Sequence, residues 1–278
     1  MEITNSETGA STLRPQARVA ATLDRASEFQ YKGKLYEAAN ELERGLSIAR
    51  ETPYEIEFMT RIRIGTTLAD VYLALNRLED AKVLARDEAA FAEKISQIMQ
   101  ATGTPEQKRT AMSGFLQTRD RATQLQLIGQ QAPEITVKQW INQGPASLRE
   151  FRGRVVLLEF WATWCKPCQQ MFLKLSALHA EHSERGLEII ALTRHYLAYR
   201  GTAESMTEEL ELMRKMVNQH SVNFHVGVAE DEQLQTVFGA NGLPTVVLID
   251  RAGIIRYIGA GGDEPLFVKI LAECLSIT

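Results

Sequence analysis

Residues 155–168 read VVLLEFWATWCKPC, and this stretch decides the fold of the second half of the chain. The apolar run 155–160 predicts a buried strand, and Pro167 fits the first turn of a helix that follows it. Cys165 and Cys168 therefore stand where the strand passes into the helix. Two cysteines at this spacing can close a small disulfide ring and open it again, so the stretch predicts redox chemistry.

The two cysteines have different predicted roles. Cys165 lies at the start of the helix, where unpaired backbone N–H groups and the helix dipole favour its thiolate, so it is the predicted nucleophile. Lys166 adds a positive charge beside it, and Pro167 occupies a position where a missing N–H costs nothing. Cys168, one turn further, is the predicted buried thiol that resolves a mixed disulfide. The redox group is then the disulfide itself, with no bound cofactor.

A zinc site is the alternative for this cysteine spacing. It needs two more Cys or His ligands at a comparable spacing, and the five histidines do not supply them. Cys274 lies far along the chain, on one apolar helical face with Phe267, Ile270 and Leu271. It is therefore predicted to be a core residue, and no metal is expected.

Residues 160–168 resemble the active-site segment of the thioredoxin superfamily. Residues 129–134 and 148–154 resemble the opening of its TlpA-like extracytoplasmic thiol-disulfide oxidoreductases. The resemblance covers residues 129–278 and implies an α/β thioredoxin-like fold, a mixed sheet flanked by helices. It also implies a bacterial protein in the periplasm or another extracytoplasmic compartment, although a cytoplasmic location stays open.

The segment 242–245, Gly-Leu-Pro-Thr, resembles the cis-proline loop of the same family. The resemblance implies that Pro244 lies beside the dithiol. It also implies that the backbone of Leu243 pairs with an extended substrate segment, with Trp164 nearby as a further substrate-binding residue. An ordinary turn before an edge strand is the alternative.

Glu159 stands six residues before Cys165, where thioredoxins carry a buried aspartate. Because Leu157 and Trp161 share its face of the strand, the carboxyl group is expected to be desolvated and its pKa raised. Such a group can accept and return the proton of Cys168. A structural salt bridge to an arginine is the alternative.

Other features of the sequence limit the chemistry. The chain lacks the Thr-x-x-Cys pattern of the peroxiredoxins, so a peroxidase is not expected. The dipeptide between the cysteines is neither the Gly-Pro of thioredoxin nor the Pro-His or Gly-His of strong oxidants, which leaves the direction of electron flow open. The partners are protein thiol or disulfide clients and an upstream redox donor or acceptor.

Composition divides the chain and excludes some functions. At 278 residues and 45% hydrophobic, the chain is long for one small α/β domain, so two domains are expected. A net charge of -4 without a basic run argues against a nucleic-acid surface, and no apolar stretch is long enough to span a membrane. Residues 1–13 are polar and acidic. They predict a flexible N-terminus and do not resemble a signal peptide.

Residues 14–128 read as helix and contain a repeat. Five positions recur at a constant offset of 43 residues: Ala26, Phe29, Gly33, Leu35 and Ala38 recur as Ala69, Tyr72, Asn76, Leu78 and Ala81. The pattern resembles tetratricopeptide repeats of the longer kind. It predicts these helices: 17–31, 34–50, 55–75, 78–100 and 105–128. Gly33 and Asn76 are expected to end the first helix of each pair in a left-handed conformation. The surface could bind a peptide or partner, or act as a spacer or self-association surface.

The second half alternates strands and helices. The predicted elements are strands at 134–140, 155–160, 187–193 and 224–228, a hairpin of 245–249 with 254–258, and helices at 166–183, 204–220 and from 264. Residues 194–201 form a long link that could border the dithiol. His195 in this link could assist proton transfer near neutral pH, or the link could be a surface loop whose tyrosines pack on the domain.

These patterns favour a thiol-disulfide oxidoreductase that exchanges electrons with protein disulfides, with the helical repeats binding a client or partner. The alternative is a non-catalytic scaffold or adaptor, in which the repeats bind a partner and the thioredoxin-like domain is structural. The two cysteines, Pro244 and Glu159 together favour catalysis, because a domain used only for packing does not need this combination.

Overall fold

The computed structural model describes residues 14–142, 144–145, 147–196, 203–262 and 264–276. The predicted flexible segment 1–13 and residues 197–201 of the long link lie outside the described residues. The chain divides into two compact units, the first ending at Leu125 and the second beginning at Gln126.

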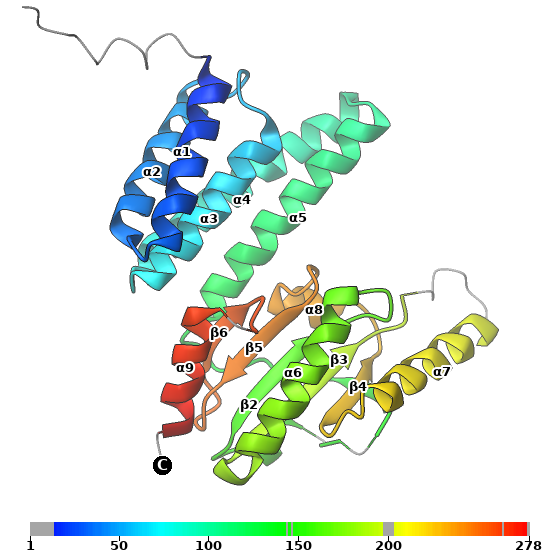
Figure 1. The fold of residues 1–278 in the computed structure, drawn as a ribbon. Helices are drawn as coiled ribbons and strands as arrows, with labels where there is room; N and C mark the ends of the chain where they lie inside the picture. The colour runs from blue at the N-terminus through cyan, green and yellow to red at the C-terminus, as the bar shows by residue number, and fades with distance from the viewer. Residues whose placement is uncertain (1–13, 143, 146, 197–202, 263, 277–278) are drawn as a thin grey trace, which may run out of the picture. The chain divides into compact units, whose positions relative to one another are not determined.

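The first unit is built from helices, as predicted (Figure 1). They are α1 (Pro15–Tyr31), α2 (Leu35–Glu51), α3 (Phe58–Ala74), α4 (Leu78–Thr102) and α5 (Pro105–Leu127). Proline is the first residue of α1 and of α5. At this position the backbone N–H makes no hydrogen bond within the helix, so its absence in proline costs nothing. The boundaries agree with the predicted helices to within about three residues, because the repeated sequence pattern carries its own start and stop signals.

The first helix of each predicted pair ends in the same way. Gly33 and Asn76 both have left-handed backbones, with φ of 71° and 63°. The next residue closes each helix, since Lys34 N–H donates to Phe29 O and Arg77 N–H donates to Tyr72 O, both at 2.8 Å. The predicted left-handed ends are confirmed.

Small side chains lie where the helices of the first unit come together. The repeated alanines are buried: Ala26, Ala38, Ala69 and Ala81. Gly45 on α2 lies so near α1 that a β-carbon there would stand 2.2 Å from Thr22 Oγ1. Residues without bulk at these positions allow the helices to approach closely.

The second unit contains one mixed sheet in the order β1-β4-β3-β2-β5-β6. The strands are β1 (Val137–Trp140), β2 (Val155–Phe160), β3 (Leu187–Thr193), β4 (His225–Ala229), β5 (Thr245–Ile249) and β6 (Ile255–Gly259). Strands β2, β3 and β4 run parallel, whereas β1, β5 and β6 pair antiparallel with their neighbours. All six residues of β2 are buried, as its continuous apolar run predicts.

Strand β1 is shorter than the predicted strand 134–140. Val137 pairs with Ala229, the last residue of β4, so the residues before Val137 have no partner on this strand. Glu134 instead accepts a hydrogen bond from the backbone N–H of Leu148 at 2.5 Å.

Helices lie on both faces of the sheet (Figure 1). The helices are α6 (Lys166–His182), α7 (Ala203–Gln219), α8 (Gln233–Phe238) and α9 (Pro265–Ser276), with short 3-10 turns at Leu148–Phe151 and Ser183–Arg185. Side chains of α6, α7 and α9 share one buried cluster with residues of β2. On the other face, Phe238 of α8 packs against Phe160, with ring centroids 5.5 Å apart. The second unit thus has the predicted thioredoxin-like α/β fold.

Helix α8 and the two 3-10 turns were not predicted from the sequence. Each spans six residues or fewer, too short for a helical hydrophobic period to develop. Cys274 lies in the buried cluster on α9, which confirms its prediction as a core residue. Within the described ranges no helix has both the length and the apolar character that a membrane span requires.

Candidate active site around the Cys165–Cys168 disulfide

Cys165 and Cys168 form a disulfide at the start of α6, with their Cα atoms 5.3 Å apart. Cys165 is the N-cap residue of this helix, and Pro167 lies in the first turn. The backbone N–H of Cys168 donates a hydrogen bond to Cys165 Sγ at 3.3 Å. The helix start therefore directs an N–H group and its dipole at the sulfur of Cys165, which favours a thiolate there after reduction.

Both cysteines are buried in the disulfide form. Cys165 is 3% exposed and Cys168 is 0% exposed. The difference lies in the predicted direction but is small. Lys166 and Pro167, between them, are exposed. The exposed surface next to the disulfide is therefore the Lys-Pro turn.

Glu159 lies in β2, an inner strand of the sheet, shortly before Cys165 in the sequence. Its neighbours in register are Ala191 on β3 and Val246 on β5. The side chain is fully buried, and neither carboxylate oxygen has a hydrogen-bond partner among the described residues. Burial alone raises its pKa well above the ordinary value, because the charged form is desolvated. No arginine pairs with it in the described part of the chain, so the salt-bridge alternative is not observed.

The Leu243–Pro244 peptide bond is cis, as the resemblance implies. Pro244 directly precedes β5, whose first residue, Thr245, pairs with Phe160 at the end of β2. The loop thus lies at the carboxyl end of β2, the same end from which Cys165 follows. Leu243 packs against the buried cluster that contains both cysteines.

Trp164, immediately before Cys165, is 62% exposed. Its ring meets Tyr196 edge to face, with centroids 5.5 Å apart and planes at 83°. Tyr196 belongs to the long link after β3, so the described part of that link does border the disulfide segment. The sequence indicated the link as a whole but did not single out Tyr196.

A hydrogen-bonded network fixes the position of Tyr196. Gln235 Nε2 on α8 donates to the tyrosine oxygen at 2.7 Å, and Arg194 Nε donates to Gln235 Oε1 at 2.7 Å. The backbone N–H of Tyr196 donates to Glu209 Oε1 on α7 at 3.0 Å. The Arg194 guanidinium lies 4.4 Å from the centre of the Tyr196 ring. Burial raises the pKa of Tyr196, so its hydroxyl stays protonated at neutral pH.

Comparison with known proteins places this site in a family. Residues 128–258 match the model of the AhpC/TSA family. We call the second unit, which contains these matched residues, the AhpC/TSA domain. Thiol-disulfide oxidoreductase ResA of Bacillus anthracis is 29% identical over 160 residues, which cover 56% of this chain and 82% of the relative. ResA of Bacillus cereus is 31% identical over 127 residues, 45% of this chain and 65% of the relative.

Solved structures resemble the same half of the chain. A putative thiol:disulfide interchange protein DsbE from Chlorobium tepidum is 26% identical, with a TM-score of 0.41, and the match covers 53% of this chain and 94% of that one. A thiol-disulfide isomerase from Corynebacterium glutamicum is 22% identical, with a TM-score of 0.44, and covers 53% of this chain and 98% of that one. The family match, the ResA relatives and the disulfide at the helix start make this chain a thiol-disulfide oxidoreductase.

Within the AhpC/TSA domain, most predicted site residues gather at one end of β2, and His195 pairs with an acid of α7. Its Nδ1 is 3.4 Å from Glu209 Oε2 on α7, and both side chains are nearly buried. Among the described contacts none joins His195 to the disulfide, and its predicted part in proton transfer stays a prediction. The described residues also contain no group of three His, Cys, Asp or Glu side chains arranged to hold a metal ion.

Proposed function

We propose that the Cys165–Cys168 pair exchanges two electrons with disulfides or thiols of protein clients. In the reducing direction the Cys165 thiolate attacks a client disulfide, forms a mixed disulfide and releases one client thiolate. Cys168 then attacks Cys165 Sγ, which closes the internal disulfide and releases the second client thiolate. The reverse sequence oxidises a client dithiol. The observation that supports this proposal is the hydrogen bond from the backbone N–H of Cys168 to Cys165 Sγ at the start of α6.

We propose Glu159 as the group that carries the proton of Cys168. Resolution of the mixed disulfide requires Cys168 to lose its proton inside a buried cluster, where water is excluded. Glu159 is buried on the same face of β2 as Leu157 and Trp161, which belong to that cluster, and its oxygens have no other described partner. A carboxyl group with a raised pKa is suited to take up and return a proton near neutral pH.

We propose that clients bind across Trp164, Leu243 and Pro244. These residues flank the disulfide at the carboxyl end of β2, and Trp164 offers an exposed aromatic face. An extended client segment could pair with the backbone at Leu243 as an added strand. Lys166 and Pro167 lie exposed between the cysteines and tune the reactivity of Cys165.

Replacement of Tyr196 tests whether the aromatic pair positions Trp164 for clients. Tyr196→Ala removes the ring that holds Trp164, and an aromatic pair is worth about 0.5–1.5 kcal/mol. We expect a rise of roughly 2- to 10-fold in KM for reduction of insulin disulfides, with kcat and the rate on a small aromatic disulfide nearly unchanged.

The matched control is Tyr196→Phe, which keeps the ring and loses only the hydroxyl that accepts from Gln235. It should retain the KM of the unmodified protein. If it raised KM as much as the alanine variant, the hydrogen bond and not the ring contact would be responsible.

We propose that the helical unit, of tetratricopeptide-like design, binds a client or partner. A groove of about 530 Å³ lies between α2, α3 and α4. Apolar Leu46, Leu68 and Leu84 line it, and it carries the carboxylates of Glu43, Glu51, Asp80 and Asp87 and one guanidinium, that of Arg50, which is paired with Glu88. Several of these acids already contact arginines or hydroxyl groups of the unit, for example Glu43 with the Tyr72 hydroxyl at 2.7 Å. An apolar groove with an acidic border favours a basic amphipathic segment.

Truncation to residues 126–278 tests the division of labour. The disulfide, Glu159 and Pro244 all lie in this fragment, and its first residues are tied to β6, since Gly129 N–H donates to Ile255 O at 2.8 Å. We expect the fragment to reduce a small aromatic disulfide at close to the full-length rate. A Cys168→Ser version should trap fewer protein clients than the same variant of the full chain, because tethering raises the local client concentration.

Reversal of charge in the full chain is the companion experiment. Glu51→Lys with Asp87→Lys should lower client trapping as the truncation does, without change in the rate on the small disulfide. A fragment that loses the small-disulfide activity would instead show that the helical unit supports the AhpC/TSA domain structurally.

We propose an extracytoplasmic, bacterial setting, on the resemblance to TlpA-like proteins. The test is labelling of Cys165 in intact cells with a thiol reagent that does not cross the cytoplasmic membrane, after mild reduction. Labelling only after lysis would place the protein in the cytoplasm.

A further inference from the structure

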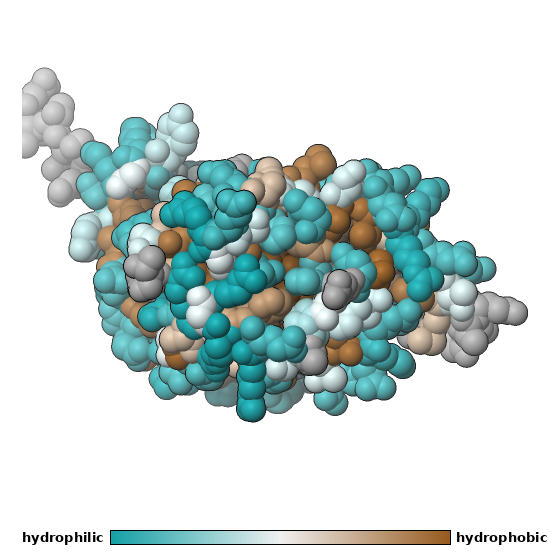
Figure 2. All heavy atoms as spheres, turned by 90° about the horizontal axis from the view of Figure 1, so that it is seen from below, coloured by the Kyte–Doolittle hydropathy of each residue, from teal (hydrophilic) through white to brown (hydrophobic). Residues whose placement is uncertain are grey.

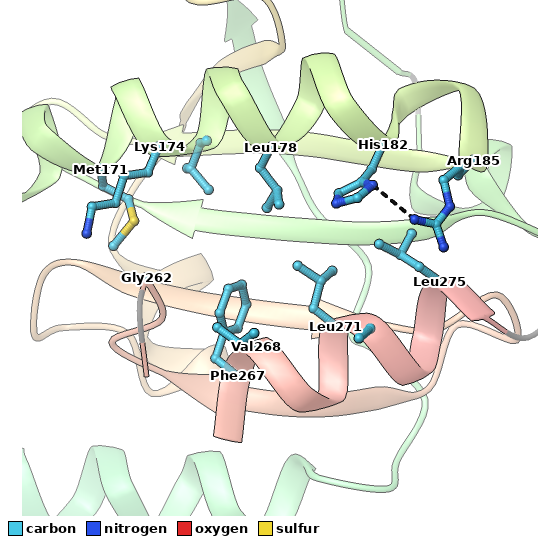
Figure 3. A pocket seen from close by; sticks show the side chains of 12 residues that line it. Met171, Lys174, Leu178, His182, Arg185, Gly262, Phe267, Val268, Leu271 and Leu275 are labelled. Atoms are coloured by element: carbon cyan, nitrogen blue, oxygen red, sulfur yellow. Dashed lines mark hydrogen bonds between the residues drawn. The ribbon is translucent and has the colours of Figure 1, made fainter. Parts of the chain in front are cut away.

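A second cavity lies in the AhpC/TSA domain between α6 and α9 (Figure 3). Its volume is about 390 Å³. This falls within the roughly 300–1,000 Å³ of typical small-molecule sites. The cavity does not include either cysteine of the disulfide, and nothing in the exchange reaction uses it.

The walls of this cavity are apolar and held in place by the core. Leu175 of α6 and Phe267, Leu271 and Leu275 of α9 line it, and each is 6% exposed or less. These side chains belong to the buried cluster under the sheet, so their positions are fixed by packing on the side away from the cavity. The site is therefore formed before any ligand enters, which lowers the entropic cost of binding.

The ionisable side chains that line the cavity are all basic. They are Lys174, His182 and Arg185, and no carboxylate is among the lining residues that the structure describes. His182 and Arg185 lie together at one end, with Nη1 of the arginine 3.4 Å from Nδ1 of the imidazole (Figure 3). Lys174 lies toward the other end, near Met171 and Gly262 (Figure 3).

The end at His182 and Arg185 keeps cationic character. No carboxylate lies within ion-pair distance of Arg185 among the described residues, and its guanidinium contacts the imidazole of His182 instead. One acid, Glu181, stands 3.6 Å from His182 Nε2, but it is 72% exposed and does not line the cavity. Solvent screens an exposed pair of this kind strongly.

The surface supplies a way in. Val268 lines the cavity and is 52% exposed, and Ala272, one turn further along α9, is also exposed. The face drawn in Figure 2 is largely hydrophilic, with apolar residues showing between the polar ones in separate patches. The cavity itself lies between α6 and α9, and its apolar lining beside Val268 and Ala272 suits an alkyl chain.

We propose that this cavity binds a straight-chain fatty acid. The alkyl chain would lie between α6 and α9 against Leu175, Phe267 and Leu271, and the carboxylate would bind Arg185 beside His182. Apolar walls explain the chain, and the wholly basic set of ionisable lining residues explains the sign of the head group. Each additional buried methylene should tighten binding about fourfold until the cavity is filled.

The test is calorimetric titration of the oxidised full-length protein with dodecanoate below its micelle concentration. We expect saturable binding of one dodecanoate per chain. Dodecyltrimethylammonium, which has the same chain and the opposite charge, should bind at least about tenfold more weakly. Equal binding of the two amphiphiles would overturn the assignment of the carboxylate to Arg185.

Two variants locate the ligand. Arg185→Gln should weaken dodecanoate binding about tenfold, because it removes a charge-assisted hydrogen bond. Ala272→Phe fills the cavity from an exposed position and should abolish binding. Lys269→Gln is the matched control, since it removes one positive charge from α9 at a residue that is 71% exposed and does not line the cavity.

All three variants should keep the rate of small-disulfide reduction, which reports an intact AhpC/TSA domain. No saturable binding to the unmodified protein, or undiminished binding to Ala272→Phe, would overturn the proposal. The proposal would also be overturned if Lys269→Gln weakened dodecanoate binding as much as Arg185→Gln does.

Discussion

Cys165→Ser is expected to abolish disulfide exchange, whereas Cys168→Ser is expected to stop it halfway, at the mixed disulfide. Cys165 Sγ, and not Cys168 Sγ, accepts a hydrogen bond from a backbone N–H at the start of α6, so the thiolate of Cys165 is the one stabilised for attack. Without Cys168 the mixed disulfide has no internal thiol to resolve it. Non-reducing electrophoresis after incubation with insulin should show a covalent adduct for Cys168→Ser and none for Cys165→Ser.

The rate of alkylation against pH checks the same assignment in the reduced protein. The alkylation rate of Cys165 should show its inflection at a lower pH than the rate of a free cysteine does. Cys274 is an internal control, because burial raises the pKa of its thiol to about 11 and it should stay unlabelled at neutral pH. If Cys168 were labelled first, or if both serine variants formed adducts equally, the two roles would have to be exchanged or abandoned.

Glu159→Gln is expected to stabilise the fold near neutral pH and to slow resolution of the mixed disulfide. Burial raises the pKa of Glu159 in the folded state, so the folded protein binds a proton that the unfolded chain has released. Stability from this group is therefore fully present below the ordinary pKa of a glutamate and falls as pH rises toward the raised pKa. The fall is about 1.4 kcal/mol per pH unit within that window.

Chemical unfolding at several pH values measures this effect. The free energy of unfolding of Glu159→Gln should lose this part of its pH dependence and exceed that of the unmodified protein at pH 7. The matched control is Glu188→Gln, because Glu188 is a buried carboxylate on the adjacent strand that pairs with Arg154 at 2.5 Å. Glu188→Gln removes a paired carboxylate and should lower the free energy of unfolding, whereas Glu159→Gln should raise it.

The kinetic part of the prediction concerns the second half of the reaction. A positioned proton acceptor typically contributes 10²–10⁴-fold, so resolution should slow by about 10²-fold near neutral pH while formation of the mixed disulfide is unchanged. Single-turnover kinetics with a chromogenic disulfide separates the two steps. An unchanged resolution rate would show that Glu159 has only a structural role.

The parts of the fold that depend on local sequence could be predicted. Strand β2, helix α6 and the left-handed ends at Gly33 and Asn76 follow from an apolar run, a helix start and a repeat, and the structure agrees with each. The burial of Glu159 also follows from its place in a strand with apolar neighbours on both sides.

Features that depend on distant partners could not be predicted. Strand β1 is short because β4 ends opposite Val137, which no window of sequence contains. Tyr196 contacts Trp164 and accepts a hydrogen bond from Gln235 in α8, a helix too short to show a period. His195 pairs with Glu209 of α7, a neighbour that no short window of sequence around His195 contains.

The burial of Cys274 in α9 has a consequence for the integrity of the oxidised protein. Three cysteines allow three different single-disulfide isomers, of which only the Cys165–Cys168 isomer is found in the folded chain. Because Cys274 is 5% exposed and its thiol resists ionisation, it cannot shuffle into the pair unless α9 opens. Isomers that contain Cys274 should therefore accumulate only when the domain unfolds, and their appearance on a peptide map would record how often α9 detaches in storage or under heat.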